Sequence, residues 1–194
     1  NQYPEHLRSL LLYGIFLCRD KELESLFNPS GVGAKLFPDF YQEFLKPLSV
    51  EERQNPAEAY SKLFESKDNT VREDALRRWS HWELRVSSLV IDEDIFLPEN
   101  EDMTFLEAHS LMEHHYFKNK GFMDGDAILA TIGKKLKDVP LNIVQGRYDL
   151  VCPPETAFEL HHAVPHSTLT IVPDAGHSAK EPGTMKALFD LAQG

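Results

Sequence analysis

The sequence predicts a mixed α/β fold in which a few parallel strands carry a large helical insertion. Three observations lead to this prediction: a short apolar run at 9–13, a helical pattern from about 20 to 120, and two C-terminal apolar runs separated by one helix. Strands joined by crossover helices pair in parallel, and a parallel sheet needs helices on both faces. We therefore expect the helical block to be a lid inserted over the carboxyl edge of the sheet, with a pocket beneath it.

Composition narrows the class of protein. The chain has 194 residues, 42% of them apolar, and a net charge of −11. That charge argues against nucleic acid or an anionic membrane surface as a partner.

Cys18 and Cys152 fit no metal spacing and are interpreted as free thiols of a reducing compartment, so a cytoplasmic location is expected. The apolar run at 10–18 is too short to span a membrane, and we expect neither a cofactor nor a metal.

The first half of the chain shows one strand and then helix starts. Residues 9–13 form a short buried strand in this interpretation. Ser49 and Glu52 have the spacing of a capping box. Asn55 followed by proline predicts a second helix start, with a helix running to about residue 65.

Two longer helices and two loops follow. One helix is predicted from 69 to about 90, an acidic loop over 92–102, a helix over 104–117 and a loop over 121–126. The first of these helices carries an apolar stripe at helical spacing. The stripe consists of Val71, Ala75, Trp79, Trp82, Val86 and Leu89.

The C-terminal part alternates strand and helix. After a short helix to about 136, strands are predicted from 141 and over 167–172, with helices over 154–164 and 184–192. The chain then divides into three segments. These are 1–19, which holds the end of a helix and the first strand; 20–137, an all-helical cap; and 138–194, a strand-helix-strand-helix unit.

Asp149 and His177 are the candidate catalytic residues. Each follows a predicted strand, and the two strands are joined by one helix. Taken singly, Asp149 is as well explained as a turn former and His177 as a loop residue. Because neighbouring parallel strands end at the same sheet edge, we expect the two side chains to lie within hydrogen-bond reach. Asp149 would orient the imidazole of His177, which would act as general base and acid.

Glu83 and Glu113 are candidates for binding a cation. Glu83 shares the helical stripe with Trp79, and Glu113 lies four residues before Phe117. The simpler interpretation is that each lies at the rim of an apolar face or pairs with an arginine. Together they suggest two carboxylates entering one aromatic-lined cavity that receives an ammonium group. Phe16, Phe27 and Phe117 could equally be core aromatics, and Cys152 a buried filler.

Several segments resemble the prolyl aminopeptidases, also called proline iminopeptidases, which are α/β-hydrolases of the serine peptidase type. The resemblance runs along essentially the whole chain. The matching segments are Tyr13-Gly-Ile-Phe16, Trp79-Ser-His-Trp-Glu83, Glu113-His-His-Tyr-Phe117, Gly146-Arg-Tyr-Asp149 and Pro173-Asp-Ala-Gly-His177. It implies the C-terminal part of an α/β-hydrolase fold, with three parallel strands, flanking helices and an inserted all-helical cap.

The resemblance also implies roles for residues. Asp149 and His177 would be triad members, and Glu83 and Glu113 would hold the free amino terminus of a peptide. The proline ring would lie among Phe16, Phe27 and Phe117. The substrate would be a peptide with an N-terminal proline, whose secondary ammonium on an apolar ring suits such a pocket.

The chain departs from the family pattern in three places. Tyr13 stands where the family usually has arginine, and His114 where it has asparagine. The oxyanion segment and the Gly-x-Ser-x-Gly nucleophile turn do not occur in these 194 residues. We expect both to belong to a missing N-terminal portion of the same fold, with Asn1–Glu5 resembling the end of the helix after the nucleophile, and little turnover from this chain alone.

Three functions remain open at this point. The first is a serine aminopeptidase that releases N-terminal proline. The second is another α/β-hydrolase, such as an esterase or epoxide hydrolase, whose substrate would not need paired carboxylates. The third is an inactive fragment or remnant that binds peptides or a partner chain, which the absent nucleophile favours.

Overall fold

The computed structural model describes residues 3–193, and the chain forms two compact units. Unit 1 comprises 1–22, 87–89 and 123–194, and unit 2 comprises 23–86 and 90–122. The helix end predicted at Asn1–Glu5 falls partly outside the described residues, and Pro4–His6, which overlaps its last two positions, forms a 3-10 turn, η1. The division into segments 1–19, 20–137 and 138–194 that the sequence suggested remains a prediction.

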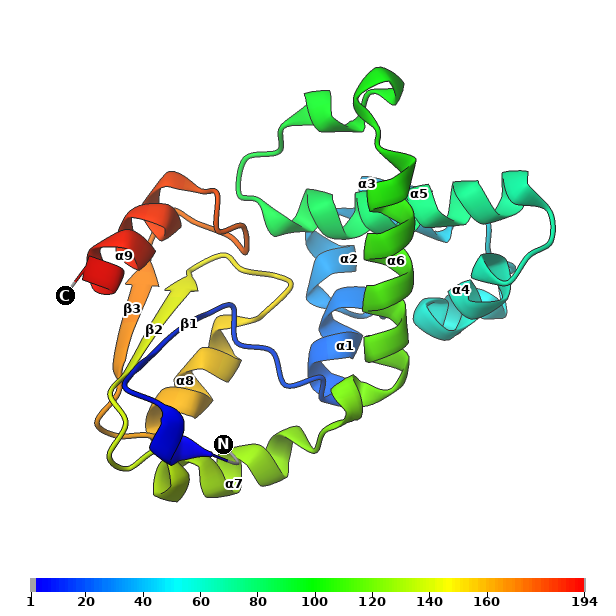
Figure 1. Cartoon of the computed structure of the whole chain (residues 1–194). Helices are drawn as coiled ribbons and strands as arrows, with labels where there is room; N and C mark the ends of the chain where they lie inside the picture. The colour runs from blue at the N-terminus through cyan, green and yellow to red at the C-terminus, as the bar shows by residue number, and fades with distance from the viewer. Residues whose placement is uncertain (1–2, 194) are drawn as a thin grey trace. The chain divides into compact units, whose positions relative to one another are not determined.

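Unit 1 is built on a parallel sheet of three strands (Figure 1). Its order is β1 (Leu10–Tyr13), β2 (Leu141–Gly146) and β3 (Thr168–Val172), with β2 in the centre. The register places Leu12 opposite Ile143 and Val144 opposite Thr170. The expectation of three parallel strands in a mixed α/β fold is therefore confirmed.

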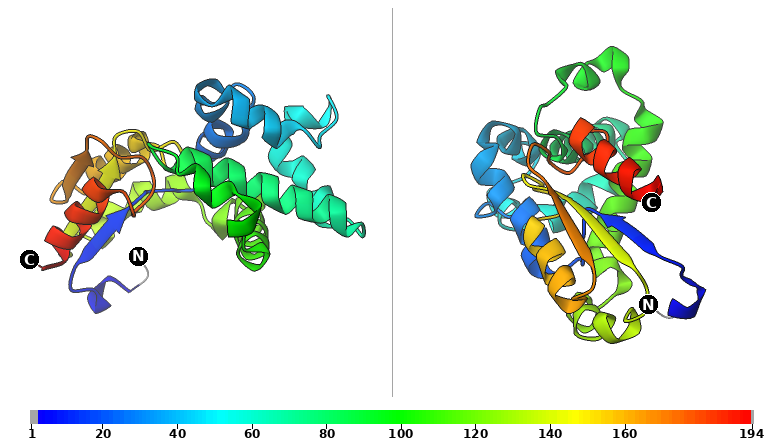
Figure 2. Two further views of the ribbon diagram at one scale, coloured as in Figure 1. Left: turned by 90° about the horizontal axis from the view of Figure 1, so that it is seen from above. Right: turned by 90° about the vertical axis from the view of Figure 1, so that its left-hand side faces the viewer.

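Helices cover both faces of this sheet (Figure 2). On one face α7 (Gly125–Lys135) and α8 (Pro154–Ala163) enclose the larger core, while α9 (Pro182–Gln193) packs on the other. The larger core is made by aliphatic side chains from the strands and both helices, namely Ile132, Leu136, Val139, Leu141, Ile143, Leu160 and Val164. Burial on both faces explains why β2 is an almost uninterrupted apolar run.

Unit 2 contains the helical insertion. Its helices are α1 (Asp20–Phe27), α2 (Val32–Leu36), α3 (Pro38–Leu45), α4 (Pro56–Phe64), α5 (Asn69–Ser87) and α6 (Met103–Lys118). The short turns between them are η2 (Glu52–Gln54), η3 (Glu93–Phe96), η4 (Pro98–Asn100) and η5 (Lys120–Phe122). The first residues of α1 and the last residue of α5 belong to unit 1. No helix among residues 3–193 combines the length and apolar character that crossing a bilayer requires.

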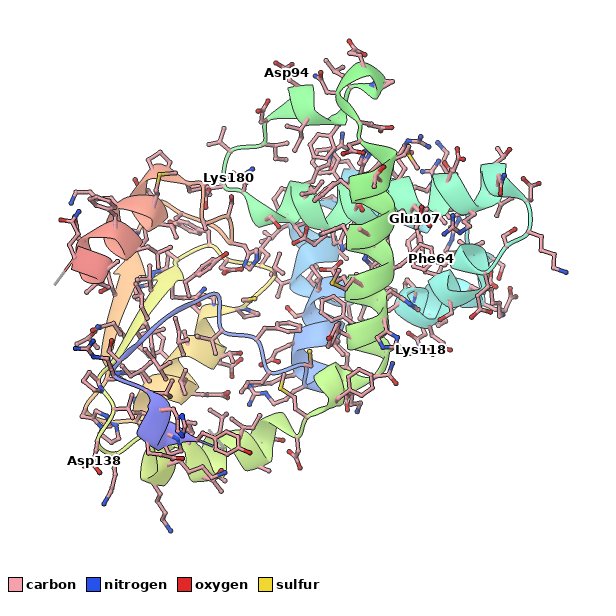
Figure 3. All side chains as sticks on the ribbon, viewed as in Figure 1. Phe64, Asp94, Glu107, Lys118, Asp138 and Lys180 are labelled. Atoms are coloured by element: carbon pink, nitrogen blue, oxygen red, sulfur yellow. The ribbon has the colours of Figure 1, made fainter. Side chains whose placement is uncertain are left out.

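Aromatic side chains form the core of unit 2. Trp79 of α5 is fully buried and stacks on Phe27 with ring centroids 4.7 Å apart. Phe44 stacks on Tyr60 at the same separation, and the Tyr60 hydroxyl donates to the Phe44 carbonyl over 2.6 Å. Phe64, at the end of α4, closes this core with its ring centroid 5.7 Å from that of Trp79 (Figure 3). The buried hydroxyl is thus satisfied, and the rings fix the helices that carry the acidic residues described below.

Two sequence predictions need correction at their edges, and the predicted capping box is confirmed. Val71 and Leu89 are exposed rather than part of the stripe, because one lies in the first turn of α5 and the other beyond its end. The segment 92–102 is not a simple loop, since η3 and η4 lie within it. The capping box at Ser49 and Glu52 forms both of its hydrogen bonds, but the helical turn it starts, η2, is only three residues long.

Candidate active site

The structure brings Asp149 and His177 together. Nδ1 of His177 lies 3.1 Å from Oδ2 of Asp149, which is the contact expected from the order of strands. Asp149 follows β2 and His177 follows β3, so both project from the carboxyl edge of adjacent parallel strands. Asp149 is buried and His177 is partly exposed, so the imidazole is accessible while the carboxylate is shielded from solvent.

Three donors hold the Asp149 carboxylate in place. The Cys152 amide donates to Oδ1 over 2.7 Å, and Nε2 of Gln145 donates to Oδ2 over 3.0 Å. The third is the imidazole of His177. Since the carboxylate only accepts, Nδ1 of His177 carries a proton and Nε2 is left as the atom that can take one from a nucleophile.

Glu181 fixes the turn that presents His177. Its Oε2 accepts from the Gly176 amide over 2.6 Å, and its Oε1 accepts from the Leu89 amide over 2.7 Å. The amides of His177 and Ser178 both donate to the carbonyl of Ser87 over 2.8 Å. The His177 turn is therefore tied to the segment 87–89 by backbone groups as well as by a side chain.

Two glycines make room for the imidazole and its turn. A Cβ at Gly146 would lie 1.9 Å from the Gly176 carbonyl oxygen, so no other residue fits at the end of β2. Gly14 has a φ of +58°, and a Cβ there would lie 3.2 Å from Cε1 of His177. Tyr13, one of the departures from the family pattern, stacks on the His177 ring with centroids 6.3 Å apart.

In unit 2, Glu83 of α5 and Glu113 of α6 also lie together. Each offers a carboxylate oxygen within a group whose atoms are all within 4.8 Å of one another, and His109 is the third member. The Trp79 indole donates to Oε2 of Glu113 over 2.6 Å. Glu83 is buried and Glu113 is partly buried, so the interpretation of a solvated rim position does not describe Glu83.

The predicted aromatic residues are divided between the units. Phe27 lies edge-on to Phe117 with centroids 5.7 Å apart, and it also stacks on Trp79, whose indole reaches Glu113. An aromatic surface therefore adjoins the acidic pair within unit 2. Phe16 belongs to unit 1, where it is half-buried in the segment after β1.

Sequence reasoning missed His109 and Ser80. Nε2 of His109 lies 3.3 Å from Oε2 of Glu83, and its Nδ1 lies 3.0 Å from the Ser80 hydroxyl. The available signal was helical spacing, because His109 precedes Glu113 by four residues and Ser80 precedes Glu83 by three. Burial opposes protonation of His109, but its bond to Glu83 and the charges of Glu113 and Glu83 outweigh this and raise its pKa.

The second departure from the family pattern, His114, is a structural residue of unit 2. It is buried, and its Nε2 lies 3.1 Å from both the Ser61 hydroxyl and the Ala57 carbonyl oxygen. Burial lowers the pKa of His114. A neutral imidazole with two partners between α4 and α6 accounts for its presence without a role in chemistry.

Two groups of side chains contain atom types that metals use. One is Asp149, Cys152 and His177, and the other is Glu83, His109 and Glu113. In the first, the Asp149–His177 contact and the Cys152 amide already occupy the carboxylate. In the second, His109 and Trp79 occupy one oxygen of each glutamate. We assign neither group as a metal site.

Fold and site together define a class of protein. Three parallel strands with helices on both faces, a helical insert, and a histidine-carboxylate pair at the carboxyl edge of the strands are the features of part of a hydrolase fold of the α/β type. Such a pair can move protons to and from a nucleophile, but it does not itself attack a substrate.

Comparison with known proteins places the chain more narrowly. No family model matches it. It is 39% identical over 188 residues to a probable proline iminopeptidase of Leptolyngbya boryana, covering 97% of this chain and 58% of that protein. It is 39% identical over 185 residues to a proline iminopeptidase of Xanthomonas citri and 38% identical over 182 residues to one of Arabidopsis thaliana. These matches cover 95% and 93% of this chain, and 58% and 47% of the relatives. The chain is homologous to the proline iminopeptidases and spans about half the length of the curated relatives it matches.

Proposed function

We propose that this chain forms part of a serine aminopeptidase that releases N-terminal proline from peptides. In this proposal Glu83 and Glu113 bind the amino terminus, and Asp149 and His177 perform proton transfer. The nucleophilic serine and the oxyanion donors come from a segment that these 194 residues do not contain. The proposal is supported by the homology to proline iminopeptidases and by the geometry of the two residue groups.

The observation that carries the proposal is the pairing of Glu83 with Glu113 beside aromatic rings. Two carboxylates gathered in a largely buried place repel each other, and their burial is costly unless a cation or donors compensate them. A prolyl amino terminus is a secondary ammonium on an apolar ring. It offers two N–H donors to the carboxylates and a ring face to Phe27 and Phe117.

The dyad accounts for the chemical step. His177, held by Asp149, takes the proton of the serine hydroxyl as it attacks the carbonyl carbon and forms the C–O bond. It then gives that proton to the leaving amine as the C–N bond breaks. Water repeats the cycle on the acyl-enzyme, which releases proline and restores the serine.

Removing either charge from the acidic pair tests the proposal. With the nucleophile segment supplied as a fusion or in trans, Glu83→Gln and Glu113→Gln should each lower kcat/KM for a prolyl amide about 10–150-fold. That range corresponds to the loss of one charge-assisted hydrogen bond of about 1.5–3 kcal/mol. Hydrolysis of a small neutral ester should change much less, because an ester has no ammonium group. The measurement is the ratio of the two efficiencies.

The matched control is Glu73→Gln, an exposed glutamate on the same helix as Glu83. It should leave both substrates unaffected. An equal fall for the amide and the ester in the Glu83 and Glu113 variants would mean that these glutamates only support the structure. No fall in either would overturn the amine-binding role.

Peptide binding without turnover is the competing function. It uses the same acidic pair, so it predicts that the 194-residue chain binds prolinamide but not N-acetylprolinamide, which lacks the ammonium. Isothermal titration of both compounds measures this. If binding is found but adding the nucleophile segment gives no hydrolysis of a prolyl amide, the chain is a binding module rather than part of a peptidase.

A further inference from the structure

His109 lies against the acidic pair in a position that bears on the charge of that pair. It is placed on α6 one turn before Glu113, and its Nε2 is 3.3 Å from Oε2 of Glu83 on α5. Its other ring nitrogen is 3.0 Å from the Ser80 hydroxyl, and its ring stacks on Phe105 with centroids 5.4 Å apart. The imidazole is therefore held on both nitrogens and on one face.

The hydroxyl partners of His109 determine which of its nitrogens carry protons. Ser110 donates its single hydroxyl proton to the Leu76 carbonyl over 2.8 Å, so its oxygen is left to accept from Ser80, 2.7 Å away. Ser80 then donates its own proton to that oxygen or to the Leu106 carbonyl, 3.3 Å away, and accepts from Nδ1 of His109, or it donates to Nδ1 instead. Nε2 faces a carboxylate, which only accepts, so Nε2 carries a proton in either case. His109 is an imidazolium in the first arrangement and a neutral ring in the second.

We propose that His109 is a specificity-determining residue of the amine pocket: as an imidazolium it neutralises the charge of Glu83 and competes with a substrate ammonium, and as a neutral ring it leaves that charge to the ammonium. The inference rests on the proposed amine-binding role of Glu83 and Glu113. In this inference, protonated His109 and the substrate ammonium are alternative partners of the Glu83 carboxylate.

The charges around His109 favour its protonated form. Glu83 comes from α5 and Glu113 from its own helix, and these are the charged groups that act on the ring among the described residues. Against the opposing effect of burial they raise the pKa of His109, so its cation persists above the usual range of histidine. Ammonium binding should therefore strengthen as pH rises through the raised value. The slope is about tenfold per pH unit at most, as expected for release of one proton.

The test measures how pyrrolidinium chloride binds to the 194-residue chain from about pH 5.5 to about pH 8.5. Pyrrolidine is a simple secondary amine that stays protonated over this range, like a lysine side chain. Wild type should bind more tightly with rising pH. His109→Gln cannot be protonated, so it should bind with a nearly constant affinity close to the high-pH value of wild type. His115→Gln, which changes an exposed histidine on the same helix, should keep the wild-type profile.

A second measurement follows the His109 ring by NMR in wild type. By reciprocity, saturating pyrrolidinium should lower the pKa of His109, and Glu83→Gln should lower it without ligand. This readout stands even if His109→Gln unfolds. Binding with a pH-independent affinity in wild type, or an unchanged slope in His109→Gln, would overturn the role of His109 alone. No binding to wild type at any pH would instead overturn the amine pocket itself, and this inference with it.

Discussion

At the scale of single residues, the Asp149–His177 pair is held from several sides. Asp149 accepts from the Cys152 amide and from Gln145, and the His177 turn is tied by Glu181 and Ser87. A catalytic imidazole must keep one tautomer and one orientation through the reaction. The hydrogen bonds around this pair would provide that restraint in the proposed reaction.

Asp149→Asn tests the importance of the carboxylate in the proposed reaction. An asparagine would keep the shape but could not fix the same tautomer of His177. With the nucleophile segment supplied, kcat for a prolyl amide should fall by about 10⁴-fold, as in serine proteases that lose this charge. Asp174→Asn, which changes an exposed acid in the turn after β3, is the control and should leave kcat unchanged. A fall of less than about tenfold would contradict a triad role for Asp149.

At the scale of elements, a buried ion pair joins the start of α1 to α8. Oε2 of Glu22 accepts from the amides of Leu17 and Arg19 over 3.0 Å each, and its Oε1 accepts from the guanidinium of Arg19 over 2.7 Å. The Thr156 hydroxyl donates to the same Oε1 over 2.7 Å, and Arg19 also reaches Glu159 over 2.5 Å. The carboxylate of Glu22 is 2% exposed, so it depends on these partners.

Glu22→Gln should therefore destabilise the chain by about 1.5–3 kcal/mol, because an amide replaces the charge-assisted hydrogen bonds of the buried carboxylate, while Arg19 keeps its contact with Glu159. Urea unfolding followed by circular dichroism measures the loss. Glu24→Gln lies two residues away on the exposed side of α1 and should cost no more than about 0.5 kcal/mol. Similar midpoints for the two variants would mean that the Glu22 network contributes little.

At the scale of the whole molecule, the sheet of unit 1 has β1 at one edge, with β2 as its partner among the described strands. Its residues Leu10–Leu12 are only partly buried, and Tyr13 is 43% exposed. An apolar edge strand with unpaired backbone groups invites another strand to pair with it. The β1 edge of this sheet is therefore a candidate surface for self-association.

We expect the 194-residue chain to self-associate as its concentration rises. Tyr13→Lys should weaken the association constant by roughly fivefold to tenfold, since a lysine on an edge opposes pairing at a cost of about 1 kcal/mol. Tyr148→Lys places the same charge on another exposed tyrosine, away from the edge, and serves as the control. Sedimentation velocity over a concentration series measures the association. A monomer at every concentration, or equal effects of the two substitutions, would contradict the edge as the cause.

The sequence by itself determined the fold class and the main elements. The apolar runs at β1, β2 and β3 and the periodic pattern of α5 and α6 were sufficient, because strand and helix spacing are local properties of the chain. The spacing of Asp149 and His177 also predicted their contact, since the ends of neighbouring parallel strands must lie at one edge. The buried stripe of α5 was predicted only in part, since Val71 and Leu89 are exposed.

Only the tertiary structure decided what surrounds these residues. Helical spacing places His109 near Glu113, but it does not show that the ring reaches across to Glu83 or that the Ser80 hydroxyl meets its other nitrogen. Likewise, nothing local indicates that Glu181 ties the His177 turn to the segment 87–89. Contacts between residues distant in sequence depend on how helices and strands pack, and packing is a property of the folded chain rather than of any one segment.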